Sequence, residues 1–365
     1  MNKIRFLTLS LLLGLSSAGT LLAQDHQPNP TIDNTERKQV IEALTKQLQA
    51  NYVFPDVATR LSAALAAKLA KGDYAAITTA NAFAEALTHD LKELGKDGHF
   101  RVGFDPDFHA PASHDAVAAK AEIEQVRQDV TSSGFGIQRV ERLPGNVGYL
   151  EIRRFGPTEI VSAAYASAMV LLSGTDALIL DLRRNGGGEP TSVAFLLSHF
   201  FAEGDERHLN DLYFRHDNIT HQYWTSPSVS VHYAKPVYVL TSARTFSGGE
   251  ECAYDFQTQK RATLVGETTG GGANPGDPVE LAHGFAAFIP NGRAINPVTH
   301  TNWEHVGVKP DIAVPAAKAQ QTAYVAILKA LLAKATDPEE RGALQHDLTN
   351  AEKGDSDPPN YSPPQ

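Results

Sequence analysis

A serine in a glycine-rich turn is the most chemically suggestive feature of the sequence. The stretch TSARTFSGGE at Thr241–Glu250 follows the apolar run Lys235–Leu240, which predicts a buried strand, and precedes residues 251–260, whose apolar positions recur near helical spacing. Ser247 therefore stands where a strand turns into a helix, and Gly248 follows it. The first N–H groups of a helix have no partner within the helix. This arrangement suits a nucleophilic hydroxyl beside donors for an oxyanion.

The same S-x-x-E spacing is also the signature of an ordinary helix cap. In that interpretation Ser247 is only an N-cap, and Glu250 closes a capping box. Because caps far outnumber nucleophiles, the serine needs support from the rest of the chain. A nucleophilic serine requires a base, an oxyanion hole and a carboxylate that orients the base.

Candidates for these three roles occur elsewhere in the sequence. His99 stands in a glycine-containing break between a predicted helix and a predicted strand, where loops carry function. The glycines at 186–188 follow the near-continuous apolar strand Ala177–Leu182 and offer backbone N–H groups. Glu304 offers a carboxylate. The ordinary alternatives are a surface histidine, a flexible or phosphate-binding loop, and a solvated charge. The glycine spacing matches neither common nucleotide-binding fingerprint.

Metal chemistry is the rival interpretation. His300, Glu304 and His305 are close in sequence, but H-x-x-x-x-H does not place both rings on one helical face, and no H-E-x-x-H occurs. Cys252 is the single cysteine, which excludes an intramolecular disulfide and a cysteine-rich metal cluster. We expect it to be a buried structural thiol. The sequence therefore predicts that neither a metal nor an organic cofactor is required.

The predicted elements form a helical segment followed by an α/β segment. Three amphipathic helices at Thr35–Ala50, Asp56–Lys71 and Asn81–Leu94 predict a small bundle. Residues 115–130 are polar and compatible with a helix. From residue 134 onward, strands are predicted at 147–152, 177–182, 237–240, 262–265, 285–289 and 312–314, with helices at 158–172, 190–200 and 316–335.

Composition places the chain among soluble globular proteins. It has 365 residues, enough for two domains, with 42% hydrophobic and 20% charged residues. The formal net charge is −10 and no arginine-rich run occurs, so nucleic acid is not an expected partner.

The N-terminus has the pattern of a secretory signal. Lys3 and Arg5 precede the apolar run Phe6–Leu15, and Leu21-Leu22-Ala23 offers a cleavage site. The apolar run is too short for a comfortable membrane span, although an uncleaved anchor is the alternative. We expect a signal peptide at residues 1–23, export to a periplasm or the cell exterior, and no stable membrane insertion after its removal.

Four motifs, in order, resemble the S41 serine peptidases, which are the C-terminal processing proteases and their relatives. The resemblance covers roughly residues 147–314, and the motifs stand at Leu180–Gly188, Thr245–Glu250, Arg261–Gly270 and Gly307–Asp311. It implies a ClpP/crotonase-like ββα core of the α/β class. It also implies that Ser247, the first residue of S-x-x-E, is the nucleophile.

The sequence departs from the processing-protease branch of that family. That branch uses a lysine base roughly 25 residues after the serine, where this chain has Gly272. The tricorn-like branch uses serine, histidine and glutamate, and its motifs match His99 in D-G-H and Glu304 before G-V-x-P-D. The helical segment and the D-G-H step also resemble the interphotoreceptor retinoid-binding branch. Only 42 residues separate Phe104 from Val147, too few for the PDZ domain of the processing proteases.

These observations predict an exported S41-type serine peptidase acting on a peptide or protein substrate. We expect a helical domain at 30–105, a catalytic core at 133–335, and a polar, proline-rich, partly disordered tail at 336–365. The predicted triad and oxyanion donors are Ser247, His99 and Glu304, with the N–H of Gly248 and one from Gly187 or Gly188. The alternative hypothesis is a binder of a retinoid or fatty acid in the same cleft, with vestigial catalysis.

Overall fold

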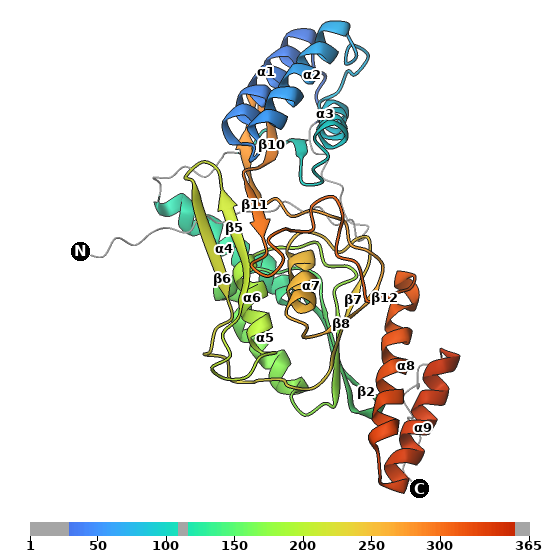
Figure 1. The fold of residues 1–365 in the computed structure, drawn as a ribbon. Coiled ribbons are helices and arrows are strands. Elements are labelled where there is room, and N and C mark those ends of the chain that lie inside the picture. The colour runs from blue at the N-terminus through green and yellow to red at the C-terminus, as the bar shows by residue number, and fades with distance from the viewer. Residues whose placement is uncertain (1–28, 109–115, 355–365) are drawn as a thin grey trace, which may run out of the picture. The chain divides into compact units, whose positions relative to one another are not determined.

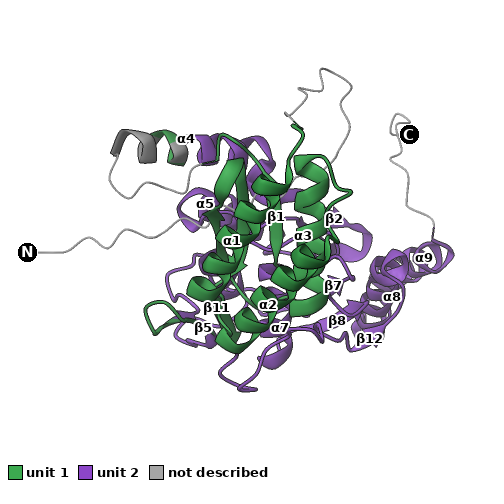
Figure 2. Ribbon diagram, turned by 90° about the horizontal axis from the view of Figure 1, so that it is seen from above, with its two compact units in different colours: residues 1–123, 211–221, 272–295 green, residues 124–210, 222–271, 296–365 purple. Residues whose placement is uncertain are grey.

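The computed structural model describes residues 29–108 and 116–354 (Figure 1). The predicted signal segment, residues 1–23, lies outside the described residues. The chain forms two compact units, coloured separately in Figure 2. Unit 1 comprises Met1–Ile123, Asp211–His221 and Gly272–Ile295, and unit 2 comprises Glu124–Asn210, Gln222–Gly271 and Asn296–Gln365.

Unit 1 begins with the three predicted helices, which the structure confirms. They are α1 (Asn34–Asn51), α2 (Pro55–Lys71) and α3 (Ala80–Gly95). The Asp33 side chain caps α1 by accepting from the N–H groups of its first turn. The helix α3 ends at Lys96, which takes a left-handed conformation with φ 58° and directs the chain toward the D-G-H step.

A small antiparallel sheet completes unit 1. Its strand order is β1 (Arg101–Phe104), β10 (Phe285–Pro290) and β9 (Gly276–Glu280). Alternate residues Phe285, Ala287 and Ile289 are buried in one apolar cluster with the three helices. The strand at 285–289 is therefore confirmed, but it pairs within unit 1 and not with the α/β strands among which the sequence placed it. A second sheet joins β11 (Gly292–Ile295), β5 (His208–Phe214) and β6 (Ile219–Trp224).

Unit 2 is built on a six-stranded sheet with the order β12-β8-β7-β4-β3-β2. The pairs from β3 to β12 are parallel, and β2 is an antiparallel edge strand. The near-continuous apolar sequences of the inner strands suit a sheet covered on both faces. The strands are β2 (Ile137–Leu143), β3 (Val147–Ile152), β4 (Ala177–Asp181), β7 (Val237–Thr241), β8 (Thr263–Gly266) and β12 (Ile312–Ala313).

Helices cover both faces of this sheet. On one face, Ile179, Leu240 and Val265 pack with α8 and α9 in a single apolar cluster. The alternate side chains Leu178 and Leu180 point to the opposite face, where α5, α6 and α7 pack. The helices are α4 (Ala116–Ser132), α5 (Thr158–Leu172), α6 (Pro190–Ser198), α7 (Gly248–Thr258), α8 (Ala316–Lys334) and α9 (Pro338–Lys353), with 3₁₀ turns at Gly134–Gly136, Pro144–Asn146 and Ala282–Gly284.

The segment after residue 336 contains a regular element. Asp337 caps α9, which forms a hairpin with α8 and buries Leu344 and Leu348 against it (Figure 1). The sequence analysis assigned this segment no secondary structure, and its last residues, 355–365, lie outside the described part. Among the described helices, none has both the length and the apolar character needed to cross a bilayer.

Candidate active site

Two neighbouring strand ends of unit 2 bring the predicted serine and glycines together. The strands β4 and β7 are parallel partners, with Asp181 opposite Leu240. Their carboxyl ends therefore meet at one edge of the sheet, where ligand sites of α/β proteins are formed. The glycine loop at 182–189 follows β4, and the turn that carries Ser247 follows β7.

Hydrogen bonds fasten the loop and the turn to each other. The Thr245 hydroxyl donates to the carbonyl of Leu182 at 2.8 Å, and the Phe246 N–H donates to the carbonyl of Asn185 at 3.0 Å. The Asn185 side chain is fully buried; its Nδ2 donates to Ile152, and its Oδ1 accepts from the N–H of Gly187 at 2.8 Å. Asn185 thus sets the shape of the glycine loop and its distance from the serine turn.

The two backbones approach so closely that side chains are excluded. A methyl group at Gly187, where φ is 101°, would lie 2.7 Å from the Cβ of Ser247. A methyl group at Gly248 would lie 2.8 Å from the carbonyl oxygen of Gly188. Real Cβ atoms do not approach other heavy atoms this closely, so glycine is required at both positions. The structure therefore brings together Ser247, Gly248, Gly187 and Gly188 within unit 2.

Ser247 has an unusual backbone conformation. Its φ of 52° and ψ of −124° lie outside the regions that non-glycine residues commonly occupy. Such conformations cost about 1–3 kcal/mol and persist only where the surroundings impose them, frequently at functional sites. Here the Ser247 N–H donates to the Oε2 of Glu250 at 2.9 Å, which is the glutamate half of a capping box.

Glu250 connects the serine turn to a third segment. Its carboxylate is fully buried, and Oε1 accepts from the Thr269 hydroxyl at 2.5 Å and from the Gly271 N–H at 2.6 Å. These partners lie in the loop that follows β8. Glu250 is a buried acceptor with three donors. It therefore connects the start of α7 both to the Ser247 turn and to the loop after β8, which a surface cap does not do.

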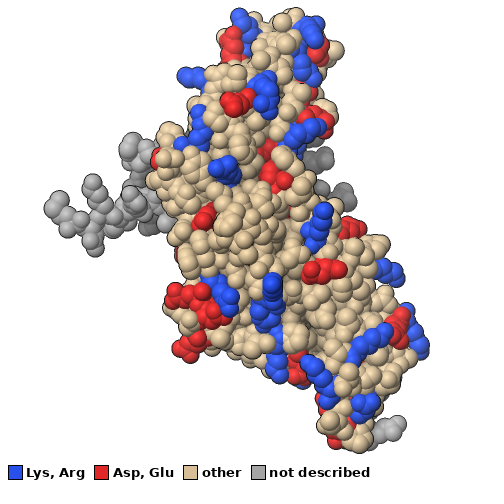
Figure 3. Space-filling view, viewed as in Figure 1, with Lys and Arg blue, Asp and Glu red and all other residues tan. Residues whose placement is uncertain are grey.

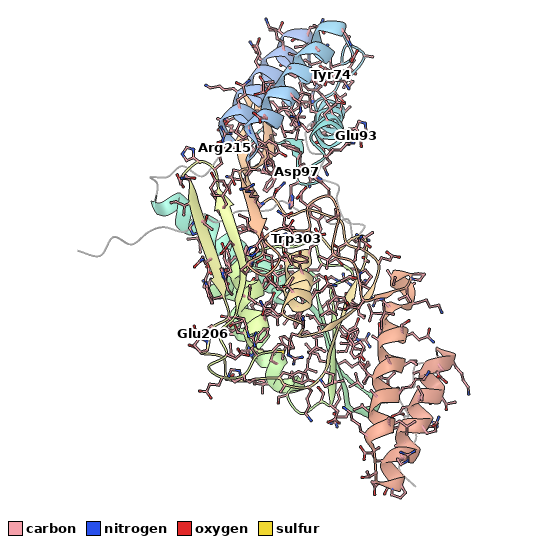
Figure 4. All side chains as sticks on the ribbon, in the orientation of Figure 1. Tyr74, Glu93, Asp97, Glu206, Arg215 and Trp303 are labelled. Atoms are coloured by element: carbon pink, nitrogen blue, oxygen red, sulfur yellow. The ribbon has the colours of Figure 1, made fainter. Side chains whose placement is uncertain are left out.

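The loop that carries Glu304 is attached to the same segment. The His305 N–H donates to the carbonyl of Gly271 at 2.9 Å, and the Val308 N–H donates to the Thr269 hydroxyl at 2.7 Å. Trp303, labelled in Figure 4, is 2% exposed and packs against Tyr254 of α7.

The Glu304 side chain itself is mostly buried. It is 8% exposed, and the Nδ1 of His305 lies 3.5 Å from its Oε1. The imidazole of His305 is 54% exposed. Ser247, the glycines and Glu304 therefore belong to one hydrogen-bonded assembly of loops in unit 2.

His99 lies in unit 1, between α3 and β1, and is 7% exposed. Its backbone N–H donates to the Oδ1 of Asp97 at 3.0 Å, and the ring nitrogen Nδ1 lies 3.5 Å from the same oxygen. Its ring stacks on Phe288 with centroids 6.3 Å apart. The pairing of His99 with Ser247 and Glu304 stays a prediction.

Two further buried acidic residues follow Glu250 on α7. Glu251 and Asp255 are one turn apart and are 4% and 0% exposed. Burial raises the pKa of Glu251 to about 7, with a further rise from the charge of Glu189. Burial and the charge of Glu251 raise the pKa of Asp255. Cys252 between them is fully buried, as predicted, and burial raises the pKa of its thiol.

Three supporting residues escaped the sequence analysis. Asn185 stands directly before the glycines, Glu250 was considered only as part of a cap, and Asp97 appeared only as the first letter of D-G-H. Each is a polar residue beside a glycine or a turn, which is a weak signal. Their roles depend on partners between 2 and 177 residues away in the sequence, which no local pattern reveals.

Comparison with known proteins identifies the family. The family model described as peptidase family S41 matches residues 146–314, and the model of the N-terminal domain of this family in eukaryotic IRBP matches residues 34–136. The chain belongs to peptidase family S41.

The individual relatives are distant. The chain is 28% identical over 191 residues to the chloroplastic carboxyl-terminal-processing peptidase 2 of Arabidopsis thaliana, covering 48% of this chain and 35% of that protein. It is 27% identical over 204 residues to the carboxyl-terminal-processing protease of Synechocystis sp., covering 54% and 46%. It thus spans less than half the length of these curated relatives.

A solved structure supports the fold. The crystal structure of a putative peptidase from Parabacteroides merdae superimposes with a TM-score of 0.55 at 21% identity, covering 82% of this chain and 98% of that chain. The expected α/β core with a helical N-terminal region is confirmed.

Proposed function

We propose that this chain is a serine-type peptidase that hydrolyses peptide bonds in a peptide or protein substrate. The observation that carries the proposal is the strained Ser247, held between a glycine loop and the first turn of α7. Glu250 holds this conformation through the hydrogen bond that its carboxylate accepts from the Ser247 N–H. A hydroxyl at the start of a helix, beside the backbone N–H of Gly248, suits attack on a carbonyl carbon.

In the proposed reaction, Ser247 Oγ attacks the carbonyl carbon while His99 removes its proton. His99 then returns that proton to the leaving amine, and Glu304 orients the imidazole. The tetrahedral oxyanion accepts hydrogen bonds from backbone N–H groups. Gly248 supplies one. Gly188 is a better second donor than Gly187, because the N–H of Gly187 already donates to Asn185.

The substrate class follows from the family and from the surface. Relatives are named for the processing of carboxyl termini. The proposal therefore covers peptide bonds in general and does not extend to recognition of free C-termini, since the 42 residues between Phe104 and Val147 are too few for the PDZ domain of those proteases. On the face shown in Figure 3, basic and acidic side chains are interspersed, which gives no support to nucleic acid as a partner.

We further propose that the protein is exported to a periplasm or the cell exterior. The support is the sequence of residues 1–23, with Lys3 and Arg5 before an apolar run and Ala23 at the cleavage site. N-terminal sequencing of protein recovered from the culture medium or the periplasmic fraction tests this. A mature chain that begins at Gln24 supports export, and an intact Met1 in the cytosolic fraction contradicts it.

The test of the peptidase is turnover of a mixed peptide library by purified protein. Ser247→Ala is expected to abolish cleavage and leave the thermal midpoint nearly unchanged, because alanine retains the β-carbon. Ser167→Ala, on the exposed side of α5, is the matched control and is expected to keep full activity. Undiminished turnover by a folded Ser247→Ala protein would remove Ser247 from the mechanism.

The match of residues 34–136 to the N-terminal domain found in eukaryotic IRBP favours a second candidate. In this alternative, the protein binds a retinoid or fatty acid and has vestigial catalysis. Glu304→Gln separates the two. If the protein is a peptidase, Glu304→Gln lowers kcat much more than it raises KM, because the Glu304 charge acts mainly in the transition state. A binder shows no peptide turnover in the wild type, and its affinity for the ligand is unchanged in the variant.

A further inference from the structure

Unit 1 contains a buried carboxylate that the proposed triad does not use. Asp97 is fully buried and stands two residues before His99, in the step between α3 and β1. Figure 4 labels it. A buried carboxylate is expensive unless it is hydrogen-bonded, so its partners indicate what it does.

The partners of Asp97 lie on three different segments of unit 1. Its Oδ1 accepts from the N–H of His99 at 3.0 Å. Its Oδ2 accepts from the Nδ2 of Asn274 at 2.9 Å and from the hydroxyl of Tyr52 at 3.3 Å. The donors on Oδ2 leave Oδ1 facing His99, whose Nδ1 lies 3.5 Å away.

These donors keep Asp97 ionised despite its burial. Burial alone would raise the pKa of the carboxyl, but the hydrogen bond and charge of His99, with the donors from Asn274 and the His99 backbone, lower it below its ordinary value. Within unit 1, Lys92 on α3 also interacts electrostatically with Asp97 and with Arg101 on β1. Asp97 therefore presents a negative charge to the imidazole throughout the neutral pH range.

The imidazole is held from a second direction as well. The Phe288 ring lies over it at an angle of 29°, and Phe288 belongs to β10, which pairs with β1. The ring plane is thus fixed by packing, and its Nδ1 edge is directed at Asp97. All of these contacts lie within unit 1.

We propose that Asp97 is a positioning residue for His99. Its carboxylate holds the Nδ1–H tautomer, leaves Nε2 as the basic nitrogen, and stabilises the imidazolium that forms when His99 takes a proton. Tyr52 and Asn274 hold Asp97 in turn. This orientation is built within the unit that carries His99. Because a neutral imidazole has a single N–H, Asp97 takes the tautomer-fixing part of the role proposed for Glu304, whose charge then acts on the imidazolium. The proposal rests on the proposed peptidase function only in taking His99 as the base.

The first test needs no substrate and no variant of Asp97. ¹⁵N-histidine labelling of the full chain, with the His99 signals assigned by His99→Gln, reports the tautomer of the neutral imidazole. The expected result is a proton on Nδ1. A neutral imidazole protonated on Nε2 would overturn the proposal.

The second test is the pH titration of the same signals in Asp97→Asn. Removing the negative charge that faces Nδ1 is expected to make the imidazolium less favourable than in the wild type, so the midpoint moves to lower pH in the variant. Asp90→Asn is the matched control, since Asp90 is another buried carboxylate of unit 1 whose partners are Lys68 and Tyr74. An unchanged midpoint in Asp97→Asn, or an equal shift in Asp90→Asn, contradicts the proposal.

Kinetics then separates the positioning role from the peptidase function itself. Groups that orient a metal-ligating histidine through hydrogen bonds contribute about 10–100-fold, and we take the same factor for Asp97 and its histidine. We expect Asp97→Asn to lower kcat by that factor, to leave KM little changed, and to shift the kcat–pH profile in the same direction as the NMR midpoint. A shifted midpoint with unchanged kcat would contradict His99 as the base while leaving its contact with Asp97 intact. If Asp97→Asn leaves the His99 NMR midpoint unchanged and the enzyme is active, the positioning role of Asp97 is refuted and the peptidase function is not.

Discussion

Glu250→Gln tests the connection that holds the candidate nucleophile in its strained turn. The wild-type carboxylate accepts from Thr269 and Gly271 on one oxygen and from the Ser247 N–H on the other. Glutamine retains one acceptor oxygen, which can serve the first two donors. Its NH₂ group then replaces the second oxygen and faces the Ser247 N–H, so that a donor meets a donor.

The expected effect follows from this single lost bond. A hydrogen bond to a charged group contributes about 1.5–3 kcal/mol, and the side chain of residue 250 is fully buried, so water does not replace the lost bond on that side. For domains of 150–250 residues, each kcal/mol corresponds to about 2–4 °C in Tm. The variant is therefore expected to unfold about 3–12 °C below the wild type. Because Ser247 would relax from φ 52°, we also expect kcat to fall by about 10²-fold.

Thermal unfolding followed by circular dichroism, together with peptide turnover at pH 8, measures both effects. Glu251→Gln is the matched control, because it makes the same change at the next buried position of α7. There the substitution removes a carboxylate whose ionisation burial opposes, so Tm is expected to stay or rise. Wild-type Tm and kcat in Glu250→Gln would refute the role of Glu250 in shaping the site.

Three further outcomes are expected. Burial raises the pKa of Glu251 to about 7, so the folded chain retains a proton that the unfolded chain releases near pH 4.5. The ionisation of Glu251 should therefore lower the free energy of unfolding by about 3 kcal/mol between about pH 4.5 and 7, and urea titrations should show a smaller fall in Glu251→Gln, where burial still raises the pKa of Asp255. Gly187→Ala should abolish turnover and lower Tm, because its methyl group would lie 2.7 Å from a neighbouring β-carbon, whereas Gly186→Ala meets nothing within 4 Å and should be active; equal activity of the two would contradict the close approach. His99→Ala should remove turnover at all pH values and His305→Ala should retain it, while the reverse result would make the exposed histidine of unit 2 the base.

The helices and inner strands could be predicted because their apolar periodicity matches their burial. The strands β4 and β7, for example, are apolar at nearly every position and are covered on both faces. The strands β5 and β9 were not predicted. Their sequences, HLNDLYF and GDPVE, interleave polar residues with apolar ones and lack a continuous pattern. Besides its neighbour β9, β10 pairs with β1, a strand more than 180 residues earlier, and no local signal records this second pairing.

The proximity of the glycine loop and the serine turn could be predicted from the topology of the parallel sheet. Gly187 and Ser247 are 60 residues apart, but each follows a strand of the parallel sheet, and the carboxyl ends of parallel neighbours meet at one edge. The supporting residues could not be found in this way. Whether Asn185, Glu250 or Asp97 is a solvated side chain or a buried acceptor depends on donors that reach it only in the folded chain.

The most direct test of the central claim is covalent labelling by a fluorophosphonate probe, followed by mass spectrometry of the digested protein. Reaction requires a serine hydroxyl activated by a base beside an oxyanion hole. We expect one adduct per chain, located on Ser247, and none in a Ser247→Ala protein with the wild-type Tm. Absence of labelling in folded wild-type protein, or an adduct that persists in Ser247→Ala, would contradict Ser247 as the nucleophile.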